Sequence, residues 1–503
     1  MKRFALLLTM VAAFFAAAVV TTPSAQAGLF GHKAATPTPS PSPSALPTAS
    51  PEPPDVAIPR LQAKLKANPN DQQAMIELAG QFLGINRPDY AVGLTQRLLQ
   101  MGDKTARVYT FDGYAMSQLG RLDQATSDLE QAANLDPGNE AVLGQLVSLY
   151  VRAGRFTDAE RIANRSMVLN KSDSQSLMML GGVLAAEQKF DAARADYEKA
   201  LALDTKNSDP IFQIARTYAA QNNIPMAIST IERALALDPQ NVQALIFKAD
   251  EYAAQHDDAK ASSAFDDAIV AASSDEQKAS IYVRKANYFA SEKKFSQAEG
   301  IFDEAIARYP KESSLHLAFG DYWAAQKNLV NAQKEWLATL AIDKEDPGAL
   351  YRLGQLSMEH GKMSDAVGYL KQATALEPDP RALAMLGQAY SYVHDYKNSK
   401  DACSKSFQMD RSPVTLACIA GADFEMKNYK EASEIFDVLD GNAKGFLDQN
   451  PQMLYIAAES YERTKQNQKA VQAFKRLLPA LRKGTPEYAK IQKQIADLSK
   501  VKH

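Results

Sequence analysis

Few residues in this sequence have the types and spacing that catalysis or metal binding requires. His256, His360 and His394 lie tens of residues apart, so we interpret them as solvated turn residues and not as metal ligands. Acidic pairs such as Asp257-Asp258 indicate solvated helix faces. The sequence contains no Walker A loop, GxSxG elbow, HExxH motif or EF-hand loop. We therefore predict that the protein is not an enzyme and that it binds no cofactor and no metal.

The two cysteines are the remaining candidates for chemistry. Cys403 and Cys418 are equally distant from the turn predicted at Asp410-Arg411-Ser412-Pro413, which joins two antiparallel helices. Equal distance from the turn places the two side chains at similar height, within range of a disulfide. An oxidising location would favour the bridge, and the alternative is a pair of buried thiols.

The N-terminus predicts export from the cytoplasm. Lys2 and Arg3 precede an apolar stretch, Phe4 to Val20, and a small-x-small pattern ends at Ala27. These are the features of a cleavable signal peptide over residues 1–27, so we expect a periplasmic or secreted protein in a bacterium-like cell. The alternative is an uncleaved inner-membrane anchor, because a stretch of seventeen apolar or small residues is close to the shortest membrane span.

A segment rich in proline, serine and threonine follows the predicted signal. Nine of the 24 prolines lie in residues 34–60. Proline fixes the backbone φ angle and removes a hydrogen-bond donor, which favours an extended, solvated chain. We predict a disordered tether over residues 28–56.

The rest of the chain is organised by an alanine that recurs at nearly constant spacing. Seven of the eleven spacings are 34 residues, and the others are 37, 33, 33 and 38. We call these twelve places the register positions, and they are Ala91, Ala125, Ala159, Ala193, Ala227, Ala261, Ala298, Ala332, Ala366, Ser399, Ala432 and Ala470. In most of the twelve, a small residue precedes the register position by twelve residues and a large one precedes it by nine.

This spacing predicts a pair of antiparallel helices in each repeat. The small residue and the large residue that follows it by three lie on one face of a first helix. A short turn reverses the chain, and the register alanine of the second helix packs against the small residue. Asp-Pro pairs such as Asp136-Pro137 and Asp238-Pro239 end the second helix, because proline cannot continue it.

The pattern resembles the tetratricopeptide repeat family, whose signature is W-x2-L-G-x2-Y, then A-x3-F, then P within 34 residues. The residues that carry the resemblance include Leu146 and Tyr150 with Ala159, Leu180-Gly181 with Ala193 and Tyr197, Ala215 and Tyr218 with Ala227 and Pro239, and Phe319-Gly320 and Trp323 with Ala332 and Trp336. The leading tryptophan is replaced throughout, Val147 replaces a small residue, and Cys403 replaces an aromatic one.

The resemblance implies an all-α solenoid, a right-handed superhelix of about twelve helix-turn-helix repeats over residues 72–484. We expect a half-repeat helix at residues 57–71 before the repeats and a capping helix at residues 485–503 after them. A solenoid needs such ends because each repeat otherwise leaves an apolar face uncovered.

The resemblance also implies a concave face made by the first helices, on which a protein or peptide partner would bind. Positions on this face lie fifteen or eleven residues before the register positions. The predicted partner-binding residues are Tyr114, Met178, Phe212, Arg216, Asp250, Asn287, Asp321, Tyr351, Gln355, Gln388 and Tyr455.

The partner itself is predicted only by class. The net charge of −3 carries no polybasic segment, so nucleic acid is not expected, and a membrane is expected only if the signal remains as an anchor. We predict a protein-interaction scaffold in an exported assembly such as secretion, envelope or pilus machinery. The alternative is an accessory protein of exopolysaccharide or cell-envelope export.

Overall fold

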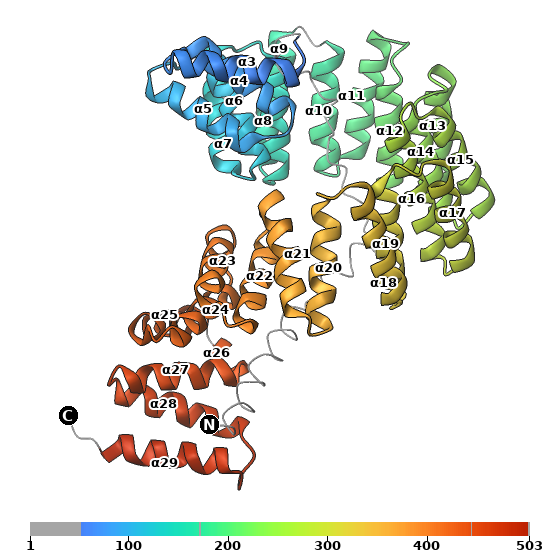
Figure 1. The fold of residues 1–503 in the computed structure, drawn as a ribbon. Helices are drawn as coiled ribbons and strands as arrows, with labels where there is room; N and C mark the ends of the chain where they lie inside the picture. The colour runs from blue at the N-terminus through green and yellow to red at the C-terminus, as the bar shows by residue number, and fades with distance from the viewer. Residues whose placement is uncertain (1–51, 171–172, 444, 501–503) are drawn as a thin grey trace. The chain divides into compact units, whose positions relative to one another are not determined.

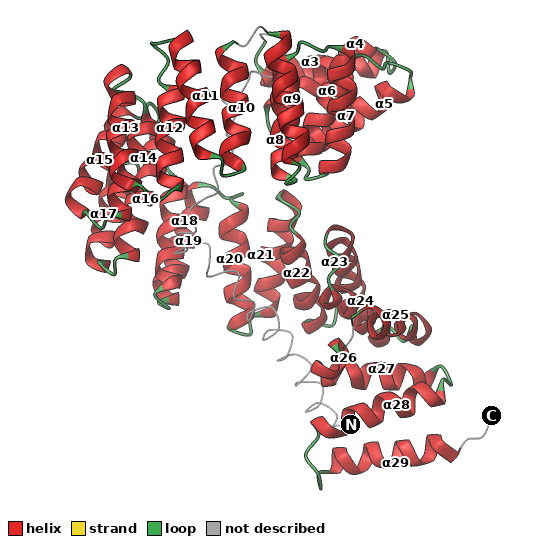
Figure 2. Cartoon of the chain, turned by 180° about the vertical axis from the view of Figure 1, so that it is seen from behind, coloured by secondary structure: helices red, strands yellow, loops and turns green. Residues whose placement is uncertain are grey.

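The computed structural model describes residues 52–170, 173–443 and 445–500. The predicted signal peptide and most of the predicted tether lie outside these residues. The described residues form helices α3 to α29 and a short 3-10 helix, and they include no strand (Figure 2). The predicted all-α fold of consecutive helical repeats is therefore confirmed.

The described residues form two compact units, which are considered separately: the N-terminal unit at residues 52–274 and the C-terminal unit at residues 275–500. Within each unit, every helix pair packs beside the next pair along the chain (Figure 1). Each pair contains one first helix and one second helix of a predicted repeat.

The N-terminal unit begins with α3 (Pro54–Ala67). Its first helices are α4 (Gln72–Gly84), α6 (Ala106–Gln118), α8 (Glu140–Arg152), α10 (Ser174–Ala186), α12 (Asp209–Ala220) and α14 (Val242–Ala254). Its second helices are α5 (Pro88–Gln100), α7 (Leu122–Leu135), α9 (Phe156–Leu169), α11 (Phe190–Leu203), α13 (Ile224–Leu237) and α15 (Asp258–Ala271).

The C-terminal unit contains six further pairs. Its first helices are α16 (Asp275–Ser291), α18 (Ser313–Ala325), α20 (Pro347–Glu359), α22 (Pro380–Tyr392), α24 (Pro413–Glu425) and α27 (Pro451–Arg463). Its second helices are α17 (Phe295–Arg308), α19 (Leu329–Ile342), α21 (Met363–Leu376), α23 (Tyr396–Met409), α25 (Tyr429–Asn442) and α28 (Asn467–Leu477). The additional elements are α26 (Phe446–Gln449), the 3-10 helix η2 (Leu478–Ala480) and α29 (Pro486–Lys500).

Both long spacings in the alanine pattern correspond to extra helical residues. Helix α16 has 17 residues, where the neighbouring first helices have 13, and this accounts for the longer interval before Ala298. The four-residue helix α26 accounts for the longer interval before Ala470. The insertions therefore fall between register positions and leave the helix pairs intact.

The turn between the two helices of a repeat has the same conformation in all twelve pairs. The residue five positions before the register position has a positive φ angle, between 56° and 73°. It is glycine in three repeats and a larger residue in nine, including His256 at 57° and Lys327 at 60°. The next backbone N–H then bonds a carbonyl five residues earlier, as from Lys362 to Ser357 at 2.8 Å. This closed turn holds the helices antiparallel.

Glycine in the first helix lets the two helices of a repeat approach closely. A Cβ atom added at Gly320 would lie 2.5 Å from the ring of Trp336 and 3.2 Å from the carbonyl oxygen of Ala332. At Gly354 the nearest atom is Cγ of Leu370, at 2.7 Å. The sequence predicted that the small residue packs on the register alanine, but its closest neighbour is the large residue four positions later.

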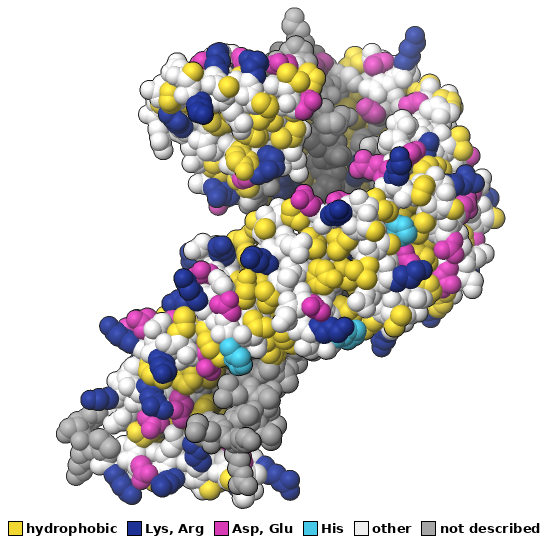
Figure 3. Space-filling model, viewed as in Figure 1, with side chains coloured by type: hydrophobic (Ala, Val, Ile, Leu, Met, Phe, Trp, Pro, Cys, Tyr) yellow, Lys and Arg dark blue, Asp and Glu magenta, His cyan; other side chains and the backbone are white. Residues whose placement is uncertain are grey.

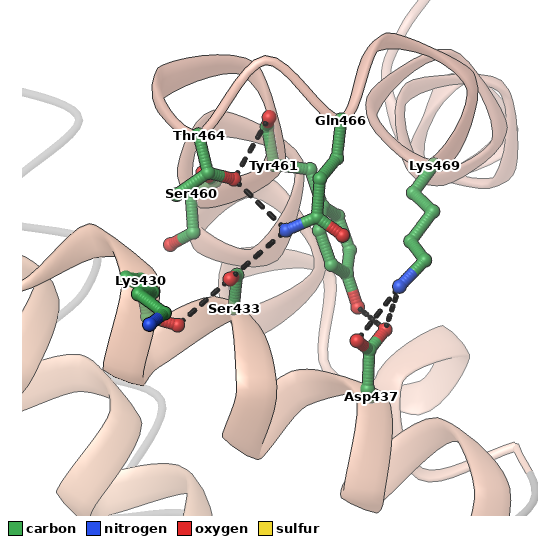
Figure 4. Close-up of polar contacts among 8 residues, drawn as sticks. All are labelled: Lys430, Ser433, Asp437, Ser460, Tyr461, Thr464, Gln466 and Lys469. Atoms are coloured by element: carbon green, nitrogen blue, oxygen red, sulfur yellow. Dashed lines mark hydrogen bonds and ion pairs between the residues drawn. The ribbon is translucent and has the colours of Figure 1, made fainter.

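Hydrogen bonds join the last two repeats despite the insertion of α26. Tyr461 donates to Asp437 at 2.9 Å, and the Lys469 ammonium contacts both oxygens of the same carboxylate at 2.9 and 2.7 Å (Figure 4). Gln466 donates to the Ser433 hydroxyl at 3.1 Å. Because α25 is thus bonded to α27, to α28 and to Gln466 directly before α28, these two repeats remain packed together.

A helix lies at each end of the described chain. Helix α3 begins at Pro54, inside the segment predicted to be a tether, because proline fits the first turn of a helix, where its missing N–H is not needed. At the other end, the Thr485 hydroxyl accepts from the backbone N–H of Tyr488, and Ile491 is buried against α28 and neighbouring helices. No described helix has both the length and the apolar character needed to cross a bilayer.

Candidate functional site

The predicted partner-binding residues all lie on first helices, but in two different units. Five belong to the N-terminal unit: Tyr114 on α6, Met178 on α10, Phe212 and Arg216 on α12, and Asp250 on α14. Six belong to the C-terminal unit: Asn287 on α16, Asp321 on α18, Tyr351 and Gln355 on α20, Gln388 on α22, and Tyr455 on α27. They are therefore described as two sets, one in each unit.

Two of these residues have little surface available for a partner. Tyr114 is 8% exposed and Gln388 is 4% exposed. Burial raises the pKa of Tyr114 to about 12, so its phenol stays neutral. Both side chains contribute mainly to packing.

Asp321 is bonded within the protein. Its carboxylate accepts from the indole N–H of Trp336 at 3.1 Å and from the Arg352 guanidinium, with one contact at 2.6 Å. The three residues come from α18, α19 and α20, so the network links the eighth repeat to the ninth. A partner would have to displace these bonds to reach the carboxylate.

Tyr455 is covered by the last helix. Lys490 on α29 donates to its phenol oxygen at 3.0 Å, and the phenol donates to Glu459 at 3.0 Å. Gln494 of α29 also donates to Glu459, at 3.1 Å. Helix α29 therefore occupies the surface of α27 on which a partner was predicted.

In the N-terminal unit, Phe212 and Arg216 form a half-buried surface on α12. The Phe212 ring packs edge-on against Phe247 of α14, with ring centroids 5.6 Å apart. The Arg216 guanidinium donates to Gln213 at 3.1 Å, and burial lowers its pKa, an effect that nearby Tyr197 partly offsets. This surface joins two consecutive repeats and combines an aromatic ring with a cation.

The C-terminal unit contains a cavity at one of the predicted positions. It measures about 250 Å³ and lies between α20, α21 and α22. We call it the Tyr351 pocket, and it is lined by Pro347, Gly348, Tyr351, Ala373, Glu377, Asp379, Arg381 and Ala382. Its volume suits a single amino-acid side chain.

The polar groups that line the Tyr351 pocket differ in whether they are already bonded within the protein. Asp379 accepts from the backbone N–H groups of Arg381 and Ala382 and so caps α22. The Arg381 side chain is exposed and makes no ion pair within the described residues. Burial raises the pKa of Tyr351, and the Asp379 carboxylate adds to this effect. The lining of the pocket therefore includes a phenol that stays neutral and an exposed guanidinium that is not in an ion pair within the described residues.

Sequence reasoning did not find Arg381. It lies eighteen residues before the register position Ser399, near the start of its first helix, where only positions fifteen and eleven residues before were considered. The available signal was an arginine near the start of α22, the next first helix after the one that contains Tyr351.

On the visible face, hydrophobic side chains gather over α20 and α21, and basic and acidic side chains are interspersed around them (Figure 3).

The cysteines and histidines occupy structural positions. Cys403 of α23 and Cys418 of α24 form a disulfide in the structure, with an S–S distance of 2.01 Å and Cα atoms 6.2 Å apart. His256, His360 and His394 are exposed at turns, and no group of three metal-binding side chains occurs in the described parts of the chain.

Comparison with known proteins identifies the repeats. Family models described as tetratricopeptide repeat match residues 117–178 and 184–246, residues 283–349, and residues 452–478. These parts of the chain carry tetratricopeptide repeats. The matched residues include helices of both units.

Similarity to individual proteins is local. An 84-residue stretch is 31% identical to cellulose synthase operon protein C of Pseudomonas fluorescens, and it spans 17% of this chain and only 7% of that protein. The Pseudomonas aeruginosa pilF structure is 18% identical and covers 44% of this chain and 99% of its own, with a TM-score of 0.35. A Thermus thermophilus tetratricopeptide repeat protein is 19% identical and covers 36% of this chain and 98% of its own, with a TM-score of 0.31.

Proposed function

We propose that the protein is a non-catalytic scaffold that binds an extended or helical segment of a partner protein on its first-helix face. The observation that carries this proposal is the Tyr351 pocket, which lies where one repeat meets the next. Grooves that bind peptides offer apolar pockets for anchor side chains and polar groups that fix their orientation. The Tyr351 pocket provides both.

The residues of the pocket suggest how such a segment would be held. The apolar side chains of Pro347, Ala373 and Ala382 would contact the anchor side chain. The Tyr351 phenol and the Arg381 guanidinium would bond its carbonyl or carboxylate groups, and bonds to a charged group are the stronger kind. We further propose that the partner belongs to an exported assembly, a location for which the N-terminal sequence is the support.

The proposal is tested with the full chain and a matched control. Immobilised wild-type protein would retain a partner from envelope extract, and the partner would be identified and purified. Tyr351→Ala and Arg381→Glu should each weaken its binding about tenfold or more, because residues at the centre of an interface dominate affinity. Lys371→Glu, an exposed site on α21, makes the same charge change outside the pocket and should bind as wild type does.

Equal affinity of all three variants for the partner would overturn the proposal that the partner binds at the Tyr351 pocket. Failure to retain any protein in these extracts would count against the scaffold function itself. Fractionation of cells that express the full chain would test the proposed location, because an exported protein should leave the cytoplasm and lose residues 1–27.

A second candidate is an accessory role in polysaccharide export. The observation that favours it is the match to cellulose synthase operon protein C, although the matched stretch is short. Sedimentation of the purified chain with cellulose would support this candidate. Retention of a protein partner without polysaccharide binding would favour the first.

A further inference from the structure

An acidic residue occupies a core position in the second repeat. Asp112 lies thirteen residues before its register position, where nine of the other eleven repeats have an apolar residue, such as Leu78 or Leu146. Its side chain is only 2% exposed. A buried carboxylate is costly unless it is paired or protonated, so this position departs from the rule that the other repeats follow.

Asp112 lies where three helices meet. The Thr95 hydroxyl of α5 donates to its carboxylate, and Asp128 of α7 is within hydrogen-bonding reach on the other side. Asp112 itself is on α6. The contact therefore joins the second helix of the first repeat to both helices of the second repeat.

The pair forms part of the wall of a cavity of about 350 Å³. The other residues that line it are uncharged, and they are Gln96, Leu99, Gln100, Met116, Gln124 and Ser127. A cavity of this size with amide and hydroxyl groups has room for water, so protons can reach the pair from solvent.

The charged groups around the pair do not neutralise both carboxylates. Arg121 lies in the turn between α6 and α7, and its positive charge favours the ionised form of Asp112. The Arg121 guanidinium lies 3.8 Å from the Met116 sulfur. On α5, Arg97 donates to Asn70, and on α7, Glu130 accepts from Tyr150. One cation at the surface thus faces two carboxyl groups.

Two carboxyl groups at such close range share a proton. Burial raises the pKa of Asp112. Burial, together with the Asp112 carboxyl, raises the pKa of Asp128 to about 7. In the unfolded chain both groups would titrate near 3.8.

We propose that Asp112 and Asp128 form a proton-dependent latch between the first two repeats, which holds α6 and α7 against α5 while the pair shares a proton and loosens when the proton leaves. The sign follows from linkage: the folded pair binds a proton that the unfolded chain has already released. Relative to the unfolded chain, the destabilisation of the fold begins near pH 4, grows as the pH rises toward 7, and is complete above 7, where the proton has left the pair. The packing of the first two repeats against each other is therefore most stable in mild acid.

Hydrogen exchange of the full chain, followed by mass spectrometry, tests the latch. Peptides from α6 and α7 should lose protection by about tenfold between about pH 5 and about pH 8, after correction for intrinsic exchange rates. Peptides from α10 and α11, which contain no such pair, provide the internal reference. Equal pH dependence in both sets of peptides would overturn the proposal.

Three variants assign the effect to the carboxyl pair. Asp128→Asn keeps a hydrogen-bonding partner without the charge and should remove the extra pH dependence. Asp112→Leu restores the apolar residue of the other repeats and should do the same. Asp123→Asn removes an exposed acid from α7, the helix of Asp128, and should leave the pH dependence unchanged. Persistence of the dependence in Asp128→Asn would contradict the latch.

Discussion

Two buried acids in equivalent helices are stabilised in different ways. Asp423 on α24 is fully buried, and its carboxylate accepts from the Lys400 ammonium at 2.7 Å and from the Asn428 amide at 3.0 Å. Asp112 on α6 is almost as buried, but it faces a second carboxyl group, Asp128. The same repeat framework thus neutralises one acid with a cation and the other with a proton.

A second pair of acids shows the same contrast. In the N-terminal unit, Glu251 is 8% exposed and its Oε2 has no hydrogen-bond partner within the described residues. Burial, and to a lesser extent Asp250, raises the pKa of Glu251 to about 7. In the C-terminal unit, the His316 ring lies 2.7 Å from the buried Glu335 carboxylate and lowers its pKa. The contributions of Glu251 and Glu335 to stability should therefore depend on pH in opposite directions.

The largest expected effect comes from removing the cation that neutralises Asp423. Lys400→Met leaves a buried carboxylate with only the Asn428 amide, and we expect a loss of about 2–3 kcal/mol in the free energy of unfolding. Urea unfolding followed by tryptophan fluorescence measures this, because Trp323 and Trp336 both lie in the C-terminal unit.

The loss is compared with the effect of a matched lysine substitution outside the ion pair. Lys371→Met, at an exposed site on α21, is the control. Equal stability of the two variants would contradict the role assigned to the ion pair.

The next effect has the opposite sign. Glu251→Gln removes a buried charge that has no partner, and we expect a gain of about 1–2 kcal/mol near pH 8 and almost none near pH 4. The difference arises because the folded protein already holds Glu251 protonated in acid, where wild type and variant are alike. Hydrogen exchange of α14 peptides measures the gain, and Glu198→Gln on α11 is an exposed control. A gain that does not vary with pH would argue against the raised pKa.

The repeat pattern could be predicted because it depends on small residues at constant spacing. Glycines such as Gly320 and Gly354 allow the paired helices of a repeat to approach closely. Counting the spacing of such residues along the chain therefore locates both helices of each repeat. Long intervals before Ala298 and Ala470 showed where extra residues lie, but not that they form an extended α16 and a separate α26.

The candidate sites could be predicted only in part, because their residues meet across helices. Tyr351 and Asp321 were both predicted to bind a partner from their positions in the repeat. The sequence did not show that Asp321 bonds Trp336 and Arg352. Asp112 and Asp128 are sixteen residues apart on different helices, whereas the sequence suggested only adjacent acids. The signal that could have found them is an acid where most repeats have an apolar residue.

The smallest effect tests the acid that is paired with histidine. Glu335→Gln should cost about 1 kcal/mol near pH 7, because it removes a charged hydrogen bond to His316. A carboxyl with a lowered pKa stabilises the fold above its unfolded value of 4.5, and that stability is lost as the pH falls through the folded pKa. The cost should therefore disappear in acid. Tryptophan fluorescence during unfolding measures it, with the exposed Glu345→Gln as reference, and a cost that grows in acid would reverse the assignment.

The central claim is that the first-helix face of these repeats binds a partner at the Tyr351 pocket. The most direct measurement places a photo-cross-linking amino acid at position 351 and, separately, at position 371 on α21, in the full chain inside the cells that produce it. We predict a cross-linked partner protein from position 351 and none from position 371. Cross-links of equal yield from both positions, or from position 371 alone, would contradict the claim.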